Sequence, residues 1–233
     1  MRSQPGFLFA TLLATAMSAY GSNIVIDNFS CPDSVSTAGP VFTSNLISCP
    51  GSIGGVREDA IFFTGGSGSN PSALTSGSGS MTGTIGSGLD GEDILLWTGS
   101  TTAGDWDLPN LDLVGDSVLV QIESPSGGTL DVTLGSGATA SSNRLDYVAS
   151  FPVSSGFADV LIPFTHPVIT GSGADLGDVT VIGLHVEVEG GGSWTMDGIS
   201  IVPEPLTTWP LGAFMVLGFV VLHRHQASSN RAE

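Results

Sequence analysis

Short runs of alternating apolar and polar residues recur between residues 23 and 202. A period of two places successive side chains on opposite faces of a strand, so each run predicts a half-buried β-strand. Gly, Ser, Asn and Asp separate the runs, as expected for turns. No stretch of this region keeps a helical period. The predicted strands are Ile24–Ile26, Ala60–Thr64, Ile94–Trp97, Ser117–Glu123, Leu130–Leu134, Leu145–Ala149, Ala158–Phe164, Val179–Glu189 and Trp194–Ile201.

About nine short antiparallel strands predict an all-β fold, an antiparallel two-sheet sandwich of jelly-roll type over residues 23–202. The stretch 65–88 is rich in Gly and Ser and has little apolar surface to bury. We therefore expect it to be a mobile connection or a weak hairpin.

The N-terminal segment 1–22 has the features of a signal peptide. Arg2 supplies a positive charge, and the apolar run from Phe7 to Ala16 is too short to span a bilayer. Small residues follow at Ala19 and Gly21, where a signal peptidase would cleave. The alternative is a buried first helix or strand.

The C-terminal segment 203–233 combines three features in order. Pro203-Glu204-Pro205 precedes an apolar run over 206–222, long enough for a short transmembrane helix, and a polar tail over 223–233 follows. Arg224, between two His residues, would hold the tail on the cytoplasmic side. The alternative is a permanent single-pass anchor.

This order resembles the PEP-CTERM sorting signal of exported proteins in Gram-negative bacteria. The resemblance implies processing near Pro203, Glu204 and Pro205 by an exosortase-type enzyme. It also implies passage through the inner membrane to the cell surface or the extracellular space. The tail departs from the family in lacking a dense Arg cluster, and Trp209-Pro210 interrupts the apolar run.

The charge balance excludes several classes of protein. Asp and Glu number 22 against 5 Lys and Arg, a formal net charge of -17, so no basic stripe exists for a nucleic acid. A hydrophobic content of 41% excludes a disordered polyelectrolyte. The abundance of Gly, with 33 residues, argues against a helical bundle.

Cys31 and Cys49 are the only cysteines in the sequence. An even pair in an exported chain predicts a disulfide, and a pair of reduced thiols is the alternative.

Three segments of the body resemble galactose-binding-like β-sandwiches, a group that includes carbohydrate-binding modules. The segments are Ile26–Phe29, Val160–Phe164 and Met196–Ile201. The resemblance implies a structural calcium ion where the first and last strands meet, with Asp27 and Asp197 as the tentative ligands. The alternative is that these two carboxylates cap turns. The other local groups of carboxylates are interpreted as solvated loop faces; they are Asp90, Glu92, Asp93, Asp105, Asp107, Asp112, Asp116, Asp175 and Asp178.

Sugar binding would need an exposed aromatic ring that stacks on a pyranose face. Trp106 is the candidate, because Asp105 and Asp107 flank it and would keep it near solvent. The alternative is that its ring covers the rim of the sandwich. Trp97 and Trp194 lie within predicted strands and are expected in the core. Arg57 and Arg144 are expected to form internal ion pairs.

The sequence offers little for catalysis. It has no Gly-x-Ser-x-Gly motif and no zinc-type His and Cys spacing. His166 precedes a proline in a predicted turn, and His185 alternates in a predicted strand. The prediction is therefore an exported, non-catalytic β-sandwich that binds polysaccharide. The alternatives are a membrane-anchored, adhesin-like module that binds protein, and a small glycan hydrolase.

Overall fold

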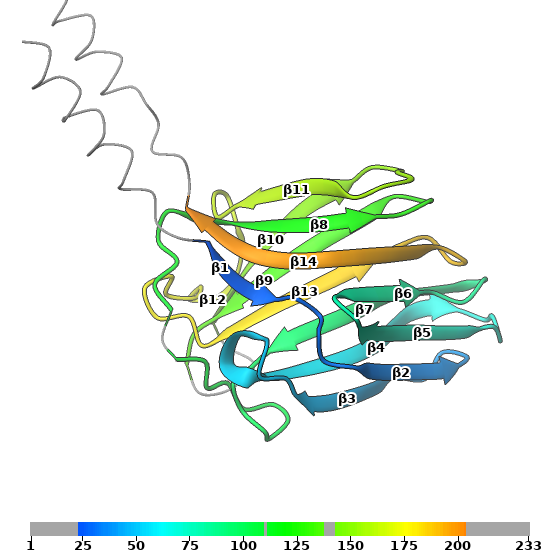
Figure 1. The fold of residues 1–233 in the computed structure, drawn as a ribbon, viewed down its shortest axis with the longest axis horizontal. Helices are drawn as coiled ribbons and strands as arrows, with labels where there is room; N and C mark the ends of the chain where they lie inside the picture. The colour runs from blue at the N-terminus through cyan, green and yellow to red at the C-terminus, as the bar shows by residue number, and fades with distance from the viewer. Residues whose placement is uncertain (1–22, 110, 138–142, 204–233) are drawn as a thin grey trace, which may run out of the picture. The chain divides into compact units, whose positions relative to one another are not determined.

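The computed structural model describes residues 23–109, 111–137 and 143–203, which fold into two antiparallel sheets of seven strands each (Figure 1). One sheet, called sheet A, contains β1 (Ile24–Asp27), β2 (Asp33–Ala38), β5 (Pro71–Gly77), β6 (Ser80–Thr84), β8 (Asp116–Glu123), β11 (Ala158–Pro163) and β14 (Ser193–Pro203). The other, sheet B, contains β3 (Thr43–Ser48), β4 (Val56–Gly66), β7 (Leu89–Trp97), β9 (Gly128–Gly135), β10 (Asn143–Phe151), β12 (Val168–Gly171) and β13 (Val181–Glu187). A short 3₁₀ helix, η1 (Ile53–Gly55), precedes β4.

The strand order in sheet A is β11-β8-β14-β6-β5-β2, with β1 also paired to β14. In sheet B the order is β12-β10-β9-β13-β7-β4-β3. The inward-facing side chains of both sheets form one hydrophobic core, as the alternation of Val118, Val120 and Ile122 on β8 illustrates. The predicted all-β fold with two antiparallel sheets is confirmed.

The sequence analysis did not predict five of the strands: β2, β3, β5, β6 and β12. The stretch 65–88, expected to be a mobile connection or a weak hairpin, forms the hairpin β5–β6 between β14 and β2. Its turn, Gly77-Ser78-Gly79, has positive φ throughout, which two glycines make accessible. Of the two expectations, the hairpin is therefore the one confirmed; β14 and β2 pair with it on either side, which compensates for its small side chains.

The last strand extends one residue beyond the predicted boundary at 202. Pro203 ends β14 and lies opposite Asp116 of β8, so the expectation that all of the proline motif stands outside the sandwich is wrong for this residue. On the other side of β14, pairing with β1 begins only at Ile201, opposite Ile24. A proline lacks only a backbone donor, so it is tolerated where pairing ends.

The segments predicted as signal peptide (1–22) and transmembrane helix (206–222) lie outside the described residues, as do Glu204, Pro205 and the tail. Within the described ranges, no helix is long and apolar enough to cross a membrane.

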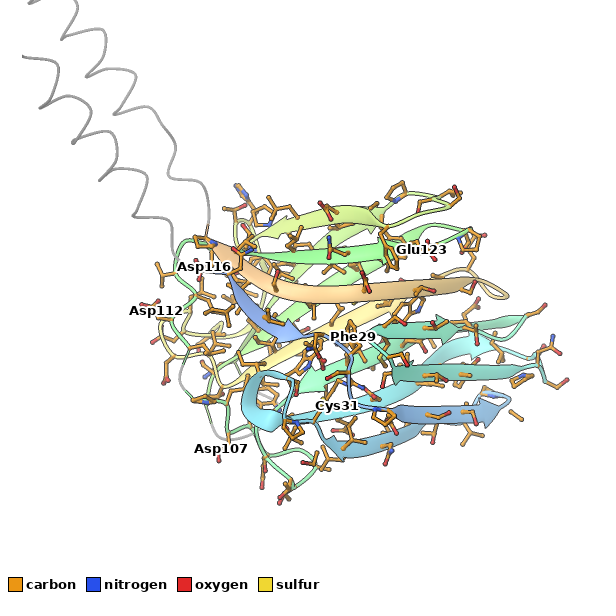
Figure 2. The ribbon with its side chains drawn as sticks, viewed as in Figure 1. Phe29, Cys31, Asp107, Asp112, Asp116 and Glu123 are labelled. Atoms are coloured by element: carbon orange, nitrogen blue, oxygen red, sulfur yellow. A yellow bond between two sulfur atoms is a disulfide. The ribbon has the colours of Figure 1, made fainter. Side chains whose placement is uncertain are left out.

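The predicted disulfide between Cys31 and Cys49 is present, with Cα atoms 5.6 Å apart. Cys31 follows β1 on the segment that leads to β2, close to Phe29 (Figure 2), and Cys49 follows β3. The bond therefore links strands of sheet A to the edge strand of sheet B.

Polar contacts between the sheets cross the core. Arg57 on β4 is fully buried; its Nη1 lies 2.8 Å from Asp27 Oδ2, and its Nε lies 2.7 Å from Asp59 Oδ1. Trp97 of sheet B donates its indole N–H to Asp27 of sheet A at 2.9 Å. Trp194 of sheet A donates in the opposite direction, to Asp93 of sheet B, at 2.8 Å.

Burial sets the ionisation of these carboxyls. It raises the pKa of Asp59 to about 7, against the opposing hydrogen bonds and charge of Arg57. It also raises the pKa of Asp93 to about 8, where the Trp194 hydrogen bond opposes the shift and Glu92 adds to it. Asp93 has a second carboxylate oxygen, Oδ1, that is buried without a hydrogen-bond partner.

Candidate functional site

Polar side chains gather on the outer face of sheet B, where four adjacent strands meet. The strand register places His185 of β13 directly opposite Asp131 of β9. Asp146 of β10 lies opposite Thr133, two residues further along β9 on the same face. Glu92 of β7 reaches His185 across the next strand pair. We call Glu92, Asp131, Thr133, Asp146 and His185 the polar platform.

Hydrogen bonds fix the two ends of the polar platform. His185 Nδ1 lies 3.1 Å from Glu92 Oε2, and Thr133 donates its hydroxyl to Asp146 Oδ1 at 2.7 Å. Between them, burial raises the pKa of Asp131, and the neighbouring charge of Asp146 adds to this effect. Asp131 Oδ1 is buried and has no hydrogen-bond partner among the described residues. The polar platform therefore presents fixed acceptors and retains unused hydrogen-bonding capacity.

An exposed aromatic pair borders the polar platform. Phe62 of β4 lies directly opposite Glu92 on the same face, and its side chain is 41% exposed. Phe42, 57% exposed, packs edge-on against it with ring centroids 6.4 Å apart. Aromatic rings bind the apolar face of a sugar, while neighbouring carboxylates accept hydrogen bonds from its hydroxyl groups. Phe42 and Phe62 with the polar platform thus supply both kinds of contact.

Trp106, the predicted sugar-stacking residue, is only 9% exposed, so the expectation that flanking aspartates keep it near solvent is wrong. Its ring packs on Gly135 at the end of β9, in the place that a Cβ atom would fill. Asp105 and Asp107 are exposed as expected, and Figure 2 shows Asp107 on the connection after β7. The loop carries the indole back onto sheet B, because the glycine leaves room for it.

Asp27 and Asp197, the tentative calcium ligands, line one small hollow of about 150 Å³. Both carboxylate oxygens of Asp27 already accept hydrogen bonds. Oδ1 accepts one from the Phe29 N–H, and Oδ2 accepts one each from Arg57 and Trp97. The arrangement does not fit a calcium ion held by both carboxylates. In the described part of the chain, no group of three or more His, Cys, Asp or Glu side chains is arranged to hold a metal ion.

The structure also shows where the other tryptophans and charged residues named in the sequence analysis lie. Trp97 and Trp194 are buried, as predicted. Arg57 forms the expected internal ion pairs, whereas Arg144 forms none with the described residues. Asp93, interpreted as part of a solvated loop face, is instead a fully buried strand residue, because it faces the core from β7.

The polar platform was not predicted as a site. Four of its members are outward positions of strands that the alternation did predict, for example Asp131 between Leu130 and Val132, whereas Glu92 was interpreted as part of a solvated loop face and lies instead on β7. The pattern shows that such residues face outward, but not which strands are neighbours. Phe62 was predicted to lie in a strand, but the sequence did not show which face it occupies, because the run Ala60–Phe63 is apolar at every position.

No protein family and no curated protein matches the chain. Among solved structures, it resembles a family 11 carbohydrate-binding module from Clostridium thermocellum in complex with a β-1,3-1,4-mixed-linked tetrasaccharide, at 16% identity and a TM-score of 0.40, over 78% of this chain and 95% of that one. A family 29 carbohydrate-binding module from Piromyces equi matches at 13% identity and a TM-score of 0.38, over 73% of this chain and 91% of that one. An exo-β-agarase matches at 12% identity and a TM-score of 0.41, over 79% of this chain and 25% of that one. Superpositions this loose carry no inference about what the present chain binds.

Proposed function

We propose that the chain is an exported, non-catalytic protein that binds polysaccharide through the outer face of sheet B. The observation that carries the proposal is the exposed ring of Phe62 directly opposite Glu92, beside the hydrogen-bonded polar platform. The ring can stack on the apolar side of a sugar, and the carboxylates can accept hydrogen bonds from its hydroxyl groups. Together they form a complementary surface for a glycan.

The geometry favours an extended chain over a single small molecule. The polar platform and Phe62 occupy five neighbouring strands, β4, β7, β13, β9 and β10. Strands are spaced by about 4.8 Å, so the surface extends for about 19 Å across the sheet. A polymer lying across the strands would contact the ring and the carboxylates at the same time.

Delivery to the cell surface is the second part of the proposal, and the termini support it. The segment 1–22 would direct export, and Pro203-Glu204-Pro205 with the apolar run 206–222 would make the chain a substrate of an exosortase-type enzyme. The mature protein would then meet exopolysaccharide outside the inner membrane.

Affinity electrophoresis and a glycan array test the binding. The purified chain should bind at least one polysaccharide, and Phe62→Ala or Glu92→Gln should weaken that binding by about tenfold, the loss of about 1.4 kcal/mol. Phe157→Ala is the matched control, because Phe157 is also an exposed phenylalanine, 48% exposed, but precedes β11 of sheet A.

The same samples separate the alternatives. Release of reducing ends from the bound glycan would indicate a hydrolase, with the Asp131 and Asp146 carboxyls as the residues to substitute. Binding to no glycan would overturn the proposal, and capture of a protein partner would then support an adhesin-like module.

A further inference from the structure

The outer face of sheet A presents a second polar surface of different chemistry. Ser34, Thr75, Thr82 and Thr195 lie directly opposite one another on β2, β5, β6 and β14. Their side chains alternate with buried neighbours such as Leu74 and Met81, so they point outward. None of these four hydroxyls has a hydrogen-bond partner among the described residues, so all four are available to a ligand.

A hollow of about 670 Å³ lies beside this hydroxyl row. It forms where the turn between β5 and β6 meets the segment from β1 to β2, and Gly79 donates its N–H to Phe29 there. No charged residue lines it; the lining residues are Ser30, Pro32, Thr75, Ser76, Gly77, Ser78, Ser80 and Thr82. Among the described residues, the lining of this hollow is therefore uncharged and rich in hydroxyl groups.

The smaller hollow that holds Asp197 borders the same crossing segment. Asn28 lines the smaller hollow and Ser30 lines the larger one, two residues further on. Gln121 and Asp197 add an amide and an exposed carboxylate to the smaller hollow. Hydroxyls, amides and the exposed Asp197 carboxylate can exchange hydrogen bonds with sugar hydroxyls, whereas Asp27, which also lines the smaller hollow, already accepts hydrogen bonds at both oxygens.

We propose that these two hollows and the hydroxyl row form a second glycan-binding groove, specific for neutral sugars. Neutrality follows from the lining: a charged sugar entering the larger hollow would lose water and gain no counter-charge. The inference rests on the proposed function of sheet B, because it gives the sandwich two binding faces. A chain with one glycan site on each sheet cross-links polysaccharide strands, since each face engages a different segment.

Titration calorimetry of the full chain in detergent, with a neutral mixed-linked β-glucan tetrasaccharide as the probe, measures the number of sites. The expected stoichiometry is two ligands per chain, falling to one in the double variant Thr75→Val and Thr82→Val. Valine keeps the shape and strand preference of threonine and removes only the hydroxyl. Thr37→Val is the matched control, because Thr37 lies on β2 but faces away from the row.

Light scattering with the polymeric β-glucan measures cross-linking. Scattering should rise with the unmodified chain, be lost in the double variant, which removes the sheet A site, and be reduced in Phe62→Ala, which weakens the sheet B site. A stoichiometry of one that the threonine variants leave unchanged would overturn the second groove and leave the sheet B proposal standing. Retained binding in Phe62→Ala, abolished by the threonine changes, would place the only site on sheet A. No binding of any glycan in the array would overturn both.

Discussion

At the scale of single residues, the buried charges explain how two sheets with few large side chains are held in one register. Arg57 occupies an inward position of β4, where the alternation predicts an apolar side chain. It lies beside the inward residues Asp59 and Trp97 of its own sheet and contacts Asp27 of the other sheet. The sequence suggested an ion pair for Arg57 because cations are so few. It could not show the partners, since Asp27 and Asp59 are two of 22 acidic residues.

Substitution of Arg57 tests its contribution directly. Arg57→Met keeps the length of the side chain but leaves Asp27 and Asp59 buried without their cation, so we expect a loss of about 3–5 kcal/mol in the free energy of unfolding. Urea denaturation measures it. Arg144→Met is the control and should cost less than about 1 kcal/mol, because Arg144 forms no ion pair with the described residues. Equal losses in the two variants would contradict this account.

The buried carboxyls also predict how stability changes with pH. Folding raises the pKa of Asp59 from 3.8 to about 7 and that of Asp93 to about 8, so the folded state binds protons that the unfolded state has released. The free energy of unfolding should therefore fall as pH rises from about 4 to about 8, by at most about 1.4 kcal/mol per pH unit for each carboxyl. The raised pKa of Asp131 acts in the same direction.

Thermal melts in metal-free buffer at constant ionic strength measure this dependence. Asp93→Asn should flatten the upper part of the curve, because the amide oxygen still accepts the Trp194 N–H without titrating. Asp159→Asn, an exposed site on β11, should leave it unchanged. Stability that increases between pH 5 and pH 8 in the unmodified chain would refute the prediction.

At the scale of elements, the sequence predicted strands where apolar residues alternate and missed them where small polar residues do. In β8, three large apolar residues point inward, and the alternation alone defines the strand. In β5, only Leu74 is a large inward residue, flanked by the buried Ser72 and Ser76. Such a strand exists because its neighbours pair with it, and that tertiary contribution leaves no local signal.

Glycines within the strands permit the close approach of the Asp93–Trp194 contact. A Cβ on Gly83 of β6 would overlap both the Asp93 carboxylate and the Trp194 indole. Gly83→Ala should therefore destabilise the chain by about 1–3 kcal/mol or more, as overpacking of a core does. Gly156→Ala, where nothing lies within 4 Å of the added atom, serves as the control and should be nearly neutral. Denaturation midpoints of the two variants provide the comparison, and indistinguishable midpoints would argue against a tight contact at Gly83.

At the scale of the whole molecule, the disulfide links the segment between β1 and β2 to the end of the edge strand β3. It closes a loop whose ends are 18 residues apart in the sequence. A bond closing a loop of this size stabilises by roughly 3 kcal/mol in the chain-entropy model. Reduction, or the pair Cys31→Ser and Cys49→Ser, should lower the melting temperature accordingly. Alkylation without reductant, followed by intact-mass measurement, should add no alkyl groups to exported protein, and two added groups would contradict the bond.

Along the sequence, the last strand of the sandwich leads directly into the Pro203-Glu204-Pro205 motif. β14 runs to Pro203, the first residue of the Pro203-Glu204-Pro205 motif, which pairs with Asp116 of β8; Glu204 and Pro205 lie outside the described residues. The two prolines fix their own φ angles and bias the preceding residues toward extended backbone, which is the conformation that proteases bind. Cleavage after the motif would leave β14 (Ser193–Pro203) intact in the released body.

Mass spectrometry of the mature C-terminus from the native host should therefore find a chain that ends near Pro205 and lacks the apolar run 206–222. Glu204→Ala should leave the apolar run attached and the protein in the inner membrane, while the disulfide and the melting temperature of the body stay unchanged, because the disulfide and the hydrophobic core lie within residues 23–203. A peptide containing Trp209 or His225 from surface-exposed mature protein would defeat the sorting proposal and support a permanent anchor. In that case the two glycan-binding faces would link polysaccharide to the membrane rather than strands of the matrix to one another.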